Sequence, residues 1–389
     1  MTEFDQIIRY VPQNSDTKID WQALNSTSLS PIFKRMAETM QNPEYHAEGD
    51  VLTHTKMVCE ALICDPEYLN ADENDKIILF LSALLHDIGK TVCTRLENGV
   101  LTSPRHSIVG AVMAREFLWH ELSLSGTKEK QILRESISNL IRYHSFPPYA
   151  ISAKDPQKRL ITIAANGELA TGFNIRKLCT LERADARGRV SKNESDHIER
   201  VEYCALAAEE ACCLDAPYKF SSDYSKRAYF SGKLSWPGGE IYRDSFGEVI
   251  LMSGLPGTGK DTWIEKNHPD MPVISLDRIR EELRVSPLEN QGPVIAEAHG
   301  RARAYLRKKT PFIWNATSIN AQLRSKQISL FEEYGASVRT VFLETSMEEE
   351  LRRNKERDRE VPERVIMNML SRLELPERHE SETVEWQIT

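Results

Sequence analysis

The sequence predicts a multidomain protein: an all-α helical bundle followed by an α/β domain with a parallel sheet. Residues 1 to about 212 carry long runs with the apolar spacing of helices. From residue 248 onward, short β-like runs alternate with helical stretches, which is typical of a parallel sheet flanked by helices. Between these parts the composition shifts to Ser, Gly, Pro and Tyr. We therefore predict a helical domain over 1–214, a linker over 215–247 and an α/β domain over 248–389.

Composition and charge are typical of a soluble globular protein. The 389 residues are 40% hydrophobic and 28% charged, and no apolar run approaches the roughly 20 residues that a membrane span needs, so we expect no membrane association. The first ten residues lack the pattern of a secretory signal, and the seven cysteines form no CxxC pair, so we expect a cytoplasmic protein with reduced thiols. A net charge of −8 gives no global attraction to nucleic acid, so binding to nucleic acid must depend on particular arginines.

Two clear helices are predicted in the helical domain. The segment DKIILFLSALLHDIGK, residues 75–90, is apolar nearly all round, as a buried helix is, and Gly89 is a natural stop just past its end. The segment over 128–144 is amphipathic and spaces four apolar residues as a helix does: Ile132, Ile137, Leu140 and Ile141.

The α/β domain is predicted to begin after the linker, whose aromatic residues suggest that it packs on other parts of the chain. Helical stretches separate the predicted strands, so we expect them to pair in parallel. The strands are four short apolar runs, at 248–254, 272–277, 311–317 and 338–344.

Histidines and aspartates of the helical domain are candidate metal ligands. Imidazole and carboxylate groups are good ligands for Mn, Fe, Co, Ni or Zn. The adjacent pair His86 and Asp87 is weak evidence alone, because an HD dipeptide occurs by chance. Histidines satisfied within a helical bundle are the alternative. The other candidates lie on separate segments that could converge on one pocket: His54, His106, His144 and Asp185.

The order H…HD…H…H…D resembles the HD phosphohydrolase superfamily, over roughly residues 45–190. Members hydrolyse phosphomonoesters or phosphodiesters. Two metals would bind the phosphate oxygens and lower the pKa of a bound water. The resemblance implies two ligand sets: His54, His86, Asp87 and Asp185 for one metal, and His106, His144 and the bridging Asp87 for the second.

Two further roles are expected around this site. Lys90 follows His86 by one helical turn and could contact the phosphate. His46 is expected to have a structural or substrate role. A site with one metal, at which His106 and His144 bind the phosphate, stays open as an alternative.

The stretch GLPGTGKDTW, residues 254–263, follows a predicted strand and nearly matches a phosphate-binding P-loop. In such a loop, backbone N–H groups and the N-terminus of the next helix cradle the phosphates, and the lysine reaches the β and γ oxygens. The expected nucleotide-binding residues are Gly254, Gly257, Thr258, Gly259, Lys260, Asp261 and Thr262.

Asp261 departs from the P-loop pattern, because it stands where a hydroxyl usually holds Mg²⁺. Kinases of the adenylate-kinase type tolerate other residues after the lysine and keep a threonine one place on, as Thr262 does here. Asp261 could hold Mg²⁺ directly or through water, or it could cap the following helix. The loop is therefore predicted to belong to a kinase.

Candidate acceptor-side residues follow the later strands. Asp277 ends the second predicted strand, where a carboxylate can take a proton from an attacking hydroxyl. Arg280 stands one turn further on and can bind an acceptor phosphate. The third strand ends with Asn315 and Thr317.

Arg353 and Arg357 lie four residues apart in a charged run and could form a lid over the transferring phosphates. A solvated charged helix is the alternative. Together with GxPGxGK, D-x-x-R and N-A-T, this run resembles 5′-OH polynucleotide kinases. The resemblance implies that Asp277 is the general base, that Arg280 binds the acceptor phosphate and that the two lid arginines clamp the donor phosphates.

Joined to the HD region, nearly the whole chain resembles the HD–polynucleotide kinase group of bacterial end-healing enzymes. The resemblance implies phosphorylation of 5′-OH ends of RNA or DNA by ATP or another NTP with Mg²⁺. It also implies removal of 2′,3′-cyclic, 2′- or 3′-phosphates at a site with one or two transition metals. Strand ends are the expected partners, with a nucleic-acid ligase as a downstream candidate. The alternatives are a metabolite or nucleotide kinase fused to a nucleotide phosphohydrolase, and a nucleotide-sensing scaffold without catalysis.

Overall fold

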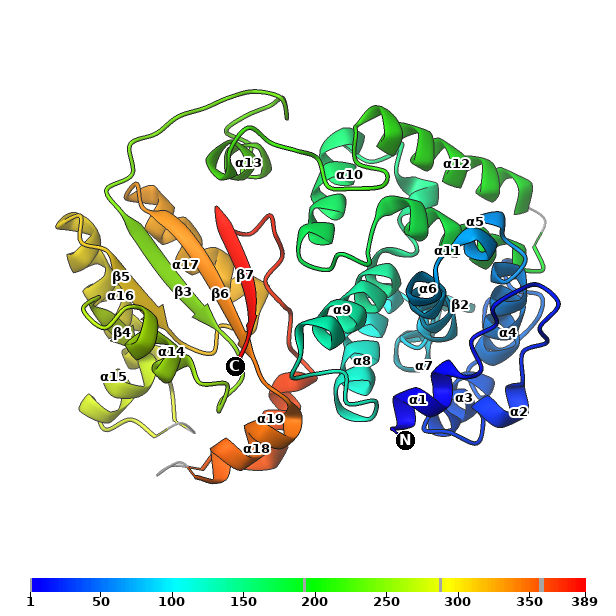
Figure 1. Cartoon of the computed structure of the whole chain (residues 1–389), viewed down its shortest axis with the longest axis horizontal. Coiled ribbons are helices and arrows are strands. Elements are labelled where there is room, and N and C mark those ends of the chain that lie inside the picture. The colour runs from blue at the N-terminus through cyan, green and yellow to red at the C-terminus, as the bar shows by residue number, and fades with distance from the viewer. Residues whose placement is uncertain (1, 192–193, 287–288, 357–359) are drawn as a thin grey trace. The chain divides into compact units, whose positions relative to one another are not determined.

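A computed structural model of the chain describes residues 2–191, 194–286, 289–356 and 360–389 (Figure 1). The chain divides into two compact units: the first comprises 1–124 and 129–218, and the second comprises 125–128 and 219–389. No described helix combines the length and the apolar character that crossing a membrane requires.

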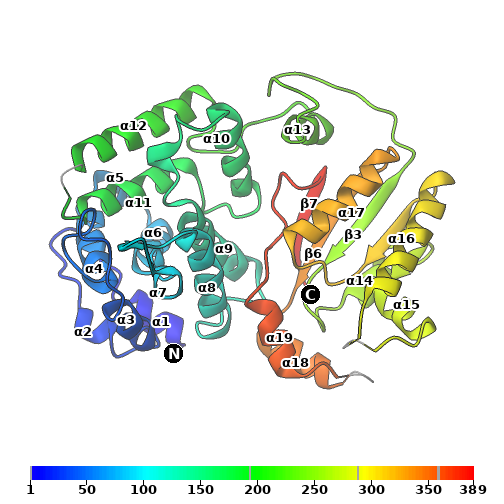
Figure 2. The same ribbon diagram turned by 180° about the vertical axis from the view of Figure 1, so that it is seen from behind.

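The first unit is helical, as the sequence predicts, and carries one small antiparallel hairpin (Figures 1 and 2). The helices that precede the hairpin are α1 (Glu3–Ile8), α2 (Trp21–Leu24), α3 (Ser30–Ala37), α4 (Val51–Leu62), α5 (Pro66–Asn70), α6 (Glu73–Leu85) and α7 (Lys90–Cys93). The hairpin strands are β1 (Arg95–Glu97) and β2 (Val100–Thr102). After them come α8 (His106–His120), α9 (Lys128–Tyr143), η1 (Pro147–Tyr149), α10 (Pro156–Ala164), η2 (Ala165–Glu168), α11 (Ile175–Arg187) and α12 (Glu194–Glu210).

Helix α6 lies at the centre of this unit. Its residues 78–85 are all buried, as the continuous apolar run predicts, and it packs against α4 and α11. The helix ends at Leu85, earlier than the predicted run to residue 90. A turn then separates it from α7, and His86 and Asp87 lie in this turn, between the two helices.

This turn requires Gly89 because a neighbouring helix leaves no room for a side chain. The residue does not end the helix by adopting a left-handed backbone conformation. Its φ is −65°, within the ordinary helical region. A Cβ at this position would lie 2.1 Å from the carbonyl oxygen of His106 and 2.6 Å from the amide nitrogen of Gly110. The missing side chain therefore allows the start of α8 to approach the turn that carries His86 and Asp87.

The second unit is an α/β domain, as the sequence predicts. Its elements are α13 (Asp223–Phe230), β3 (Glu248–Ser253), α14 (Lys260–Asn267), β4 (Val273–Ser275), α15 (Leu276–Glu282), α16 (Gly292–Arg307), β5 (Phe312–Asn315), α17 (Ala321–Glu333), β6 (Ser337–Glu344), α18 (Met347–Lys355), α19 (Glu363–Leu370) and β7 (Thr383–Ile388).

The five strands form a parallel sheet in the order β4-β5-β3-β6-β7. Side chains alternate across it: Val249 and Leu251 pack with α16 and α17 on one face, and Ile250 and Met252 pack with α14 on the other. The four predicted strands are confirmed, whereas β7 was not predicted. Because all strands run the same way, the residues that follow them gather at one edge, where ligands bind to open α/β sheets.

The segment over 215–247, treated as a linker in the sequence analysis, contains α13. Arg227 on this helix pairs with Glu332 on α17 at 2.6 Å, and Asp223 pairs with Arg378 at 2.6 Å. The ring of Phe230 lies 6.0 Å from that of His379. These contacts hold the helix against the α/β unit.

Candidate active sites

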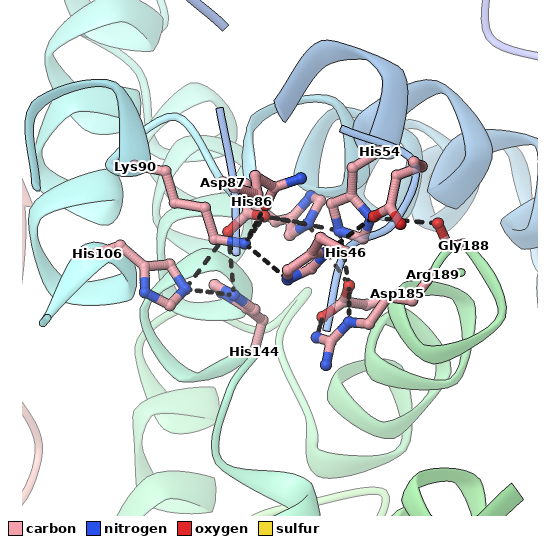
Figure 3. A network of polar contacts seen from close by, with 12 residues as sticks. His46, His54, His86, Asp87, Lys90, His106, His144, Asp185, Gly188 and Arg189 are labelled. Carbon is pink, nitrogen blue, oxygen red and sulfur yellow. Dashed lines mark hydrogen bonds and ion pairs between the residues drawn. The ribbon is translucent and has the colours of Figure 1, made fainter. Parts of the chain in front are cut away.

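Six side chains from five elements or turns of the first unit converge on one point (Figure 3). All are buried except His106, whose side chain is 21% exposed. They are His54 on α4, His86 and Asp87 in the turn after α6, His106 at the start of α8, His144 just after α9, and Asp185 on α11. These are the six residues that the sequence selected as metal ligands, and the fold brings all of them together.

The carboxylate of Asp87 faces histidines on both sides. Its Oδ2 atom lies 3.6 Å from His54 Nε2 and 3.3 Å from His86 Nε2. Its Oδ1 atom lies 3.4 Å from His106 Nε2 and 3.8 Å from His144 Nε2. One carboxylate therefore stands between two groups of nitrogen donors and could serve as a metal ligand with either group.

Three of the histidines are oriented by their own backbone. His86, His106 and His144 each place Nδ1 against the carbonyl oxygen three residues earlier, at 2.8, 2.9 and 2.7 Å. An Nδ1–H that donates to a carbonyl leaves Nε2 as the atom with the free lone pair. All three Nε2 atoms therefore face Asp87 in the form that binds a metal.

Several polar atoms at the centre lack a hydrogen-bond partner among the described residues. They include His86 Nε2 and Asp87 Oδ1, both buried. Leaving such an atom unsatisfied costs about 1–3 kcal/mol. A divalent cation would satisfy both, and a mixed set of imidazole and carboxylate donors suits Mn, Fe, Co, Ni or Zn. The residues therefore fit a metal centre.

His54 lies between two carboxylates. Its Nε2 atom is 2.9 Å from Asp185 Oδ1, and its Nδ1 atom is 2.9 Å from Glu48 Oε1. Burial lowers the pKa of His54, but the two carboxylates outweigh burial and the pKa is raised. A cation bound by Nε2 would take the place of a proton, so metal binding releases a proton here. Glu48 was not predicted from the sequence.

The two aspartates remain ionised despite burial. Burial raises the pKa of Asp87, but Lys90 and His86 outweigh it and hold the pKa well below its usual value. For Asp185, burial is likewise outweighed by Arg189 and His54. Ionised carboxylates are the forms that bind a metal.

Lys90, which the sequence suggests could contact the phosphate, lies against the cluster. Its Nζ atom lies 2.6 Å from Asp87 Oδ2, donates to Gln41 Oε1 at 2.7 Å and lies 3.4 Å from His46 Nε2. Burial lowers the pKa of His46 to about 4, so this ring is neutral at neutral pH. The amine is thus held beside the Asp87 carboxylate, where it can also reach a bound phosphate.

Three more polar residues at the cluster were missed by the sequence analysis. Arg189 forms an ion pair with Asp185, and Glu182 Oε1 lies 2.6 Å from His197 Nε2. Arg189 stands four residues after Asp185, just past the end of α11 at Arg187, and this short spacing was a signal that could have identified it. The pairing of Glu182 with His197 joins two helices, so no local pattern indicates it.

A cleft of about 590 Å³ opens onto the metal-ligand cluster. Its wall includes Asp87, Lys90, His106, His144 and Arg189. The cleft therefore combines candidate metal ligands with two cations, and a phosphate ester can reach both.

In the second unit, the predicted P-loop connects β3 to α14. Gly254 has a φ of +141°, and a Cβ there would lie 2.5 Å from the carbonyl oxygen of Leu343, so glycine is required. Lys260 Nζ donates to the carbonyl oxygens of Gly254 at 2.9 Å and Leu255 at 2.7 Å. Gly257 and Gly259 also have positive φ, at 87° and 76°. The loop and its lysine therefore curl around the space where a P-loop holds phosphate.

The two threonines of the loop differ in their surroundings. Thr258 is buried, and its hydroxyl donates to the carbonyl oxygen of Leu255 at 2.8 Å. Thr262 lies in the first turn of α14 and is exposed. Thr258 therefore supports the loop from inside, whereas Thr262 remains accessible.

Asp261 is held by the neighbouring strand. Asn315, the last residue of β5, donates from Nδ2 to Asp261 Oδ1 at 2.7 Å. The cap of α14 is Gly259, without a side-chain hydrogen bond, so Asp261 does not cap the helix. One carboxylate oxygen is thereby oriented while the residue stays exposed at the edge of the sheet.

The predicted acceptor-side residues lie at this edge too. Asp277 is the second residue of α15, just beyond β4, and it forms an ion pair with Arg280. Arg280 also donates from Nε to Gln291 Oε1 at 2.9 Å. The Asp277 side chain is 71% exposed, so a hydroxyl substrate can reach it.

The predicted lid corresponds to α18. Arg353 lies close to the loop, because a Cβ at Gly259 would be 3.3 Å from its guanidinium. Its Nε atom donates to Glu349 at 2.6 Å. Arg357, the second predicted lid arginine, lies outside the described residues.

Glu350 on α18 was not predicted. Its side chain is fully buried, and both carboxylate oxygens lack a hydrogen-bond partner among the described residues. Its carbonyl oxygen would lie 3.0 Å from a Cβ at Gly257. Burial raises the pKa of Glu350 to about 8, so the group is neutral beside the phosphate loop at pH 7. A neutral side chain avoids repelling a nucleotide.

Two family models match parts of this chain. The fold and the sites define a chain with an HD phosphohydrolase domain followed by a P-loop domain of the kinase type. Residues 51–166 match the family model of the HD domain, and residues 249–376 match that of an AAA domain. Both ranges contain part of the site described above: His54, His86, Asp87, His106 and His144 in the first, and the P-loop, Asp277 and Arg353 in the second.

Proposed function

We propose that this protein is a bifunctional enzyme that heals RNA or DNA ends. One site would phosphorylate 5′-OH ends, and the other would remove 2′,3′-cyclic, 2′- or 3′-phosphates. The observation that carries the proposal is the presence on one chain of a cluster suited to phosphoester hydrolysis and a loop suited to phosphoryl transfer. A broken strand with a 5′-OH and a 3′-phosphate is a substrate for both reactions.

At the HD site, the six converging residues would hold one or two divalent ions, with Asp87 between them. When bound, such ions polarise the phosphate and lower the pKa of a bound water. Lys90 and Arg189 line the cleft beside the ligands and would neutralise the phosphate oxygens. The Nδ1 bonds of His86, His106 and His144 would keep their rings aligned during turnover.

At the kinase site, the loop N–H groups and Lys260 would bind the phosphates of ATP or another NTP, which carries Mg²⁺. Asp277 would accept the proton of the 5′-hydroxyl, and Arg280 would bind the neighbouring phosphate of the strand. Their ion pair would have to open when substrate binds, which frees the carboxylate to act as a base. Arg353, and by the resemblance Arg357, would stabilise the charge on the transferring group.

A panel of acceptors tests this function. The purified protein is given a γ-labelled NTP, Mg²⁺ and Mn²⁺, together with either a 5′-OH oligonucleotide or a set of small phosphorylated metabolites. We expect label on the oligonucleotide and loss of 3′-phosphate from the same strand. Label on a metabolite alone would instead favour a metabolite kinase, and no turnover on any acceptor would favour a nucleotide-sensing scaffold. A nucleic-acid ligase acting downstream is a partner that we propose on the same grounds.

A further inference from the structure

The cleft above the HD cluster carries two exposed tyrosines, and they point to how the substrate is recognised. We propose that Tyr45 and Tyr149 form a stacking platform for the terminal nucleobase of the strand whose phosphate is removed. This inference rests on the proposed phosphoesterase and specifies its substrate: a nucleotide end, and not an isolated phosphate ester.

Both tyrosines line the cleft, and both rings are accessible. Tyr45 is 50% exposed and Tyr149 is 59% exposed. Among the described residues neither phenol has a hydrogen-bond partner, whereas the buried Tyr68 donates to the carbonyl oxygen of Pro12 at 2.7 Å. Exposed rings at the wall of a cavity offer apolar faces that a planar base can cover.

The backbone that carries each tyrosine forms a short hydrogen-bonded turn, and both residues line the cleft beside the metal-ligand cluster. The Tyr45 amide donates to the carbonyl oxygen of Asn42 at 3.1 Å, and the next residue, His46, reaches Lys90. The Tyr149 amide donates to the carbonyl oxygen of Phe146 at 2.9 Å, within η1, which begins at Pro147. A platform that is already ordered loses little entropy when a base stacks on it.

The size and polarity of the cleft fit a nucleotide. A volume of about 590 Å³ lies in the range of sites that enclose small organic ligands, and a phosphate group fills only part of it. Lys90 and Arg189 provide the charge for the phosphate, whereas Pro148, Val100 and Leu101 add apolar wall. The part of the rim on α12 contains Glu194 and Asp196 with Arg200, so it is mixed in charge and poorly suited to bases.

Stacking is tolerant of sequence, because every base has an aromatic face. An enzyme that treats any broken end needs this tolerance. Loss of stacking on a tyrosine is expected to lower binding of a base by about tenfold. The effect should be confined to substrates that carry a base at the terminal nucleotide.

The test compares two oligonucleotides that differ only at the 3′ end. One ends in an ordinary nucleotide with a 3′-phosphate, and the other ends in an abasic nucleotide with a 3′-phosphate. We expect the wild-type enzyme to prefer the first by about tenfold or more in kcat/KM. Tyr45→Ala with Tyr149→Ala should abolish the preference, mainly through KM, and Tyr45→Phe with Tyr149→Phe should keep it.

Two controls separate stacking from other effects. Tyr203 on α12 is also exposed, at 46%, but does not line the cleft, so Tyr203→Ala should leave the preference unchanged. Leucine at both cleft positions keeps apolar bulk without a ring, which provides a second variant if the alanine protein does not fold. Leucine variants that retain the full preference would overturn the proposal.

The remaining outcomes are distinct from one another. A wild-type enzyme that hydrolyses both ends equally well would overturn the stacking platform but leave the phosphoesterase intact. A wild-type enzyme that hydrolyses neither end in the presence of Mn²⁺, Co²⁺ or Ni²⁺ would overturn the proposed function and the platform together.

Discussion

At the scale of single residues, Asp261 occupies the P-loop position that usually carries a hydroxyl, and a residue of the neighbouring strand β5 binds its side chain. The hydrogen bond from Asn315 orients one oxygen of its carboxylate, at 2.7 Å. Mg²⁺ prefers oxygen ligands, so a carboxylate held in this way can contact the ion or one of its waters in place of the usual hydroxyl. The cap of α14 at Gly259 makes no side-chain bond, which removes the competing explanation for Asp261.

We expect Asp261→Ser to keep kinase activity within about tenfold of wild type, because serine is the usual residue at this position. Asp261→Lys should lose about a hundredfold or more, since a cation would stand beside the metal. The measurement is kcat for 5′ phosphorylation across an Mg²⁺ titration. Asn315→Ala is the matched control. It should raise the Mg²⁺ concentration that half-maximal activity requires when Asp261 is present, but not in the serine variant. Equal activity of the lysine variant and wild type would show that Asp261 has no role at the metal.

The buried histidines make the metal-free protein sensitive to acid. Burial lowers the pKa of His144 to about 3, whereas an unfolded histidine titrates near 6.5. The unfolded chain therefore binds more protons than the folded chain below pH 6.5, and stability falls as pH falls, by about 1.4 kcal/mol per pH unit for such a group. The raised pKa of His54 acts in the opposite sense: the stability that it contributes is fully present well below pH 6.5 and is lost as pH rises through the folded pKa.

We therefore expect the melting temperature of chelator-treated protein to fall between pH 7 and pH 5. In His144→Gln, the free energy of unfolding should depend less steeply on pH. The decrease in slope should correspond to close to one bound proton. Urea unfolding at several pH values measures this slope. The exposed His120→Gln serves as the control and should leave the slope unchanged. An identical slope in the His144 variant would contradict the burial argument.

At the scale of elements, the short turn between α6 and α7 organises the HD site. It carries His86, Asp87 and Gly89, and α8 approaches it so closely that a Cβ at Gly89 would meet backbone. His106 begins α8. The spacing between the two histidine groups around Asp87 thus depends on one glycine.

We predict that Gly89→Ala destabilises the protein by about 1–3 kcal/mol, as overpacking does. It should also lower metal affinity, because α8 must shift and takes His106 with it. Calorimetric unfolding and metal titration measure the two effects. Gly300→Ala on α16 is the control: a Cβ there meets nothing within 4 Å, so stability should be unchanged or slightly higher. Wild-type metal binding in the Gly89 variant would contradict this role for the turn.

Elements with strong local patterns could be predicted from the sequence. The apolar run of α6, the amphipathic α9 and the strands β3, β4, β5 and β6 are examples. The strand β7 was missed because its half-buried, partly charged sequence gains its pairing from β6, far away in the chain. The turn at Gly89 was misplaced because its cause is the approach of another helix.

The candidate site could be predicted only where a residue type was itself informative. Histidine and aspartate suggest metal, so all six converging residues were among the predicted candidates. Glu48 approaches His54 from a loop, and Glu350 is buried under the P-loop by packing. Glutamates are common on surfaces, and the sequence offers nothing that marks these two as buried.

At the scale of the whole molecule, each unit has its own core and its own candidate site. Residues of the metal-ligand cluster all lie in the first unit, and the P-loop sheet with Asp277 and Arg353 lies in the second. Helices of the second unit pack on both faces of the sheet. Removing a ligand from one unit should therefore leave the fold of the other intact.

This independence is the basis of a reciprocal prediction. Asp87→Ala should lose metal and phosphoesterase activity, because the Asp87 carboxylate belongs to both groups of candidate ligands. Lys260→Ala should lose 5′ phosphorylation by at least about a hundredfold, because the cation beside the transferring phosphate is gone. Each variant should retain the activity that the other lacks. Circular dichroism and metal content report whether the variants are folded.

The most direct test uses one oligonucleotide that carries both a 5′-OH and a 3′-phosphate. Wild type, Asp87→Ala and Lys260→Ala are each incubated with it, a γ-labelled NTP, Mg²⁺ and either Mn²⁺, Co²⁺ or Ni²⁺, and both ends are analysed. The account predicts that wild type converts both ends, that the Asp87 variant converts only the 5′ end and that the Lys260 variant converts only the 3′ end. Loss of both activities in a folded Asp87 variant, or retention of both, would contradict it.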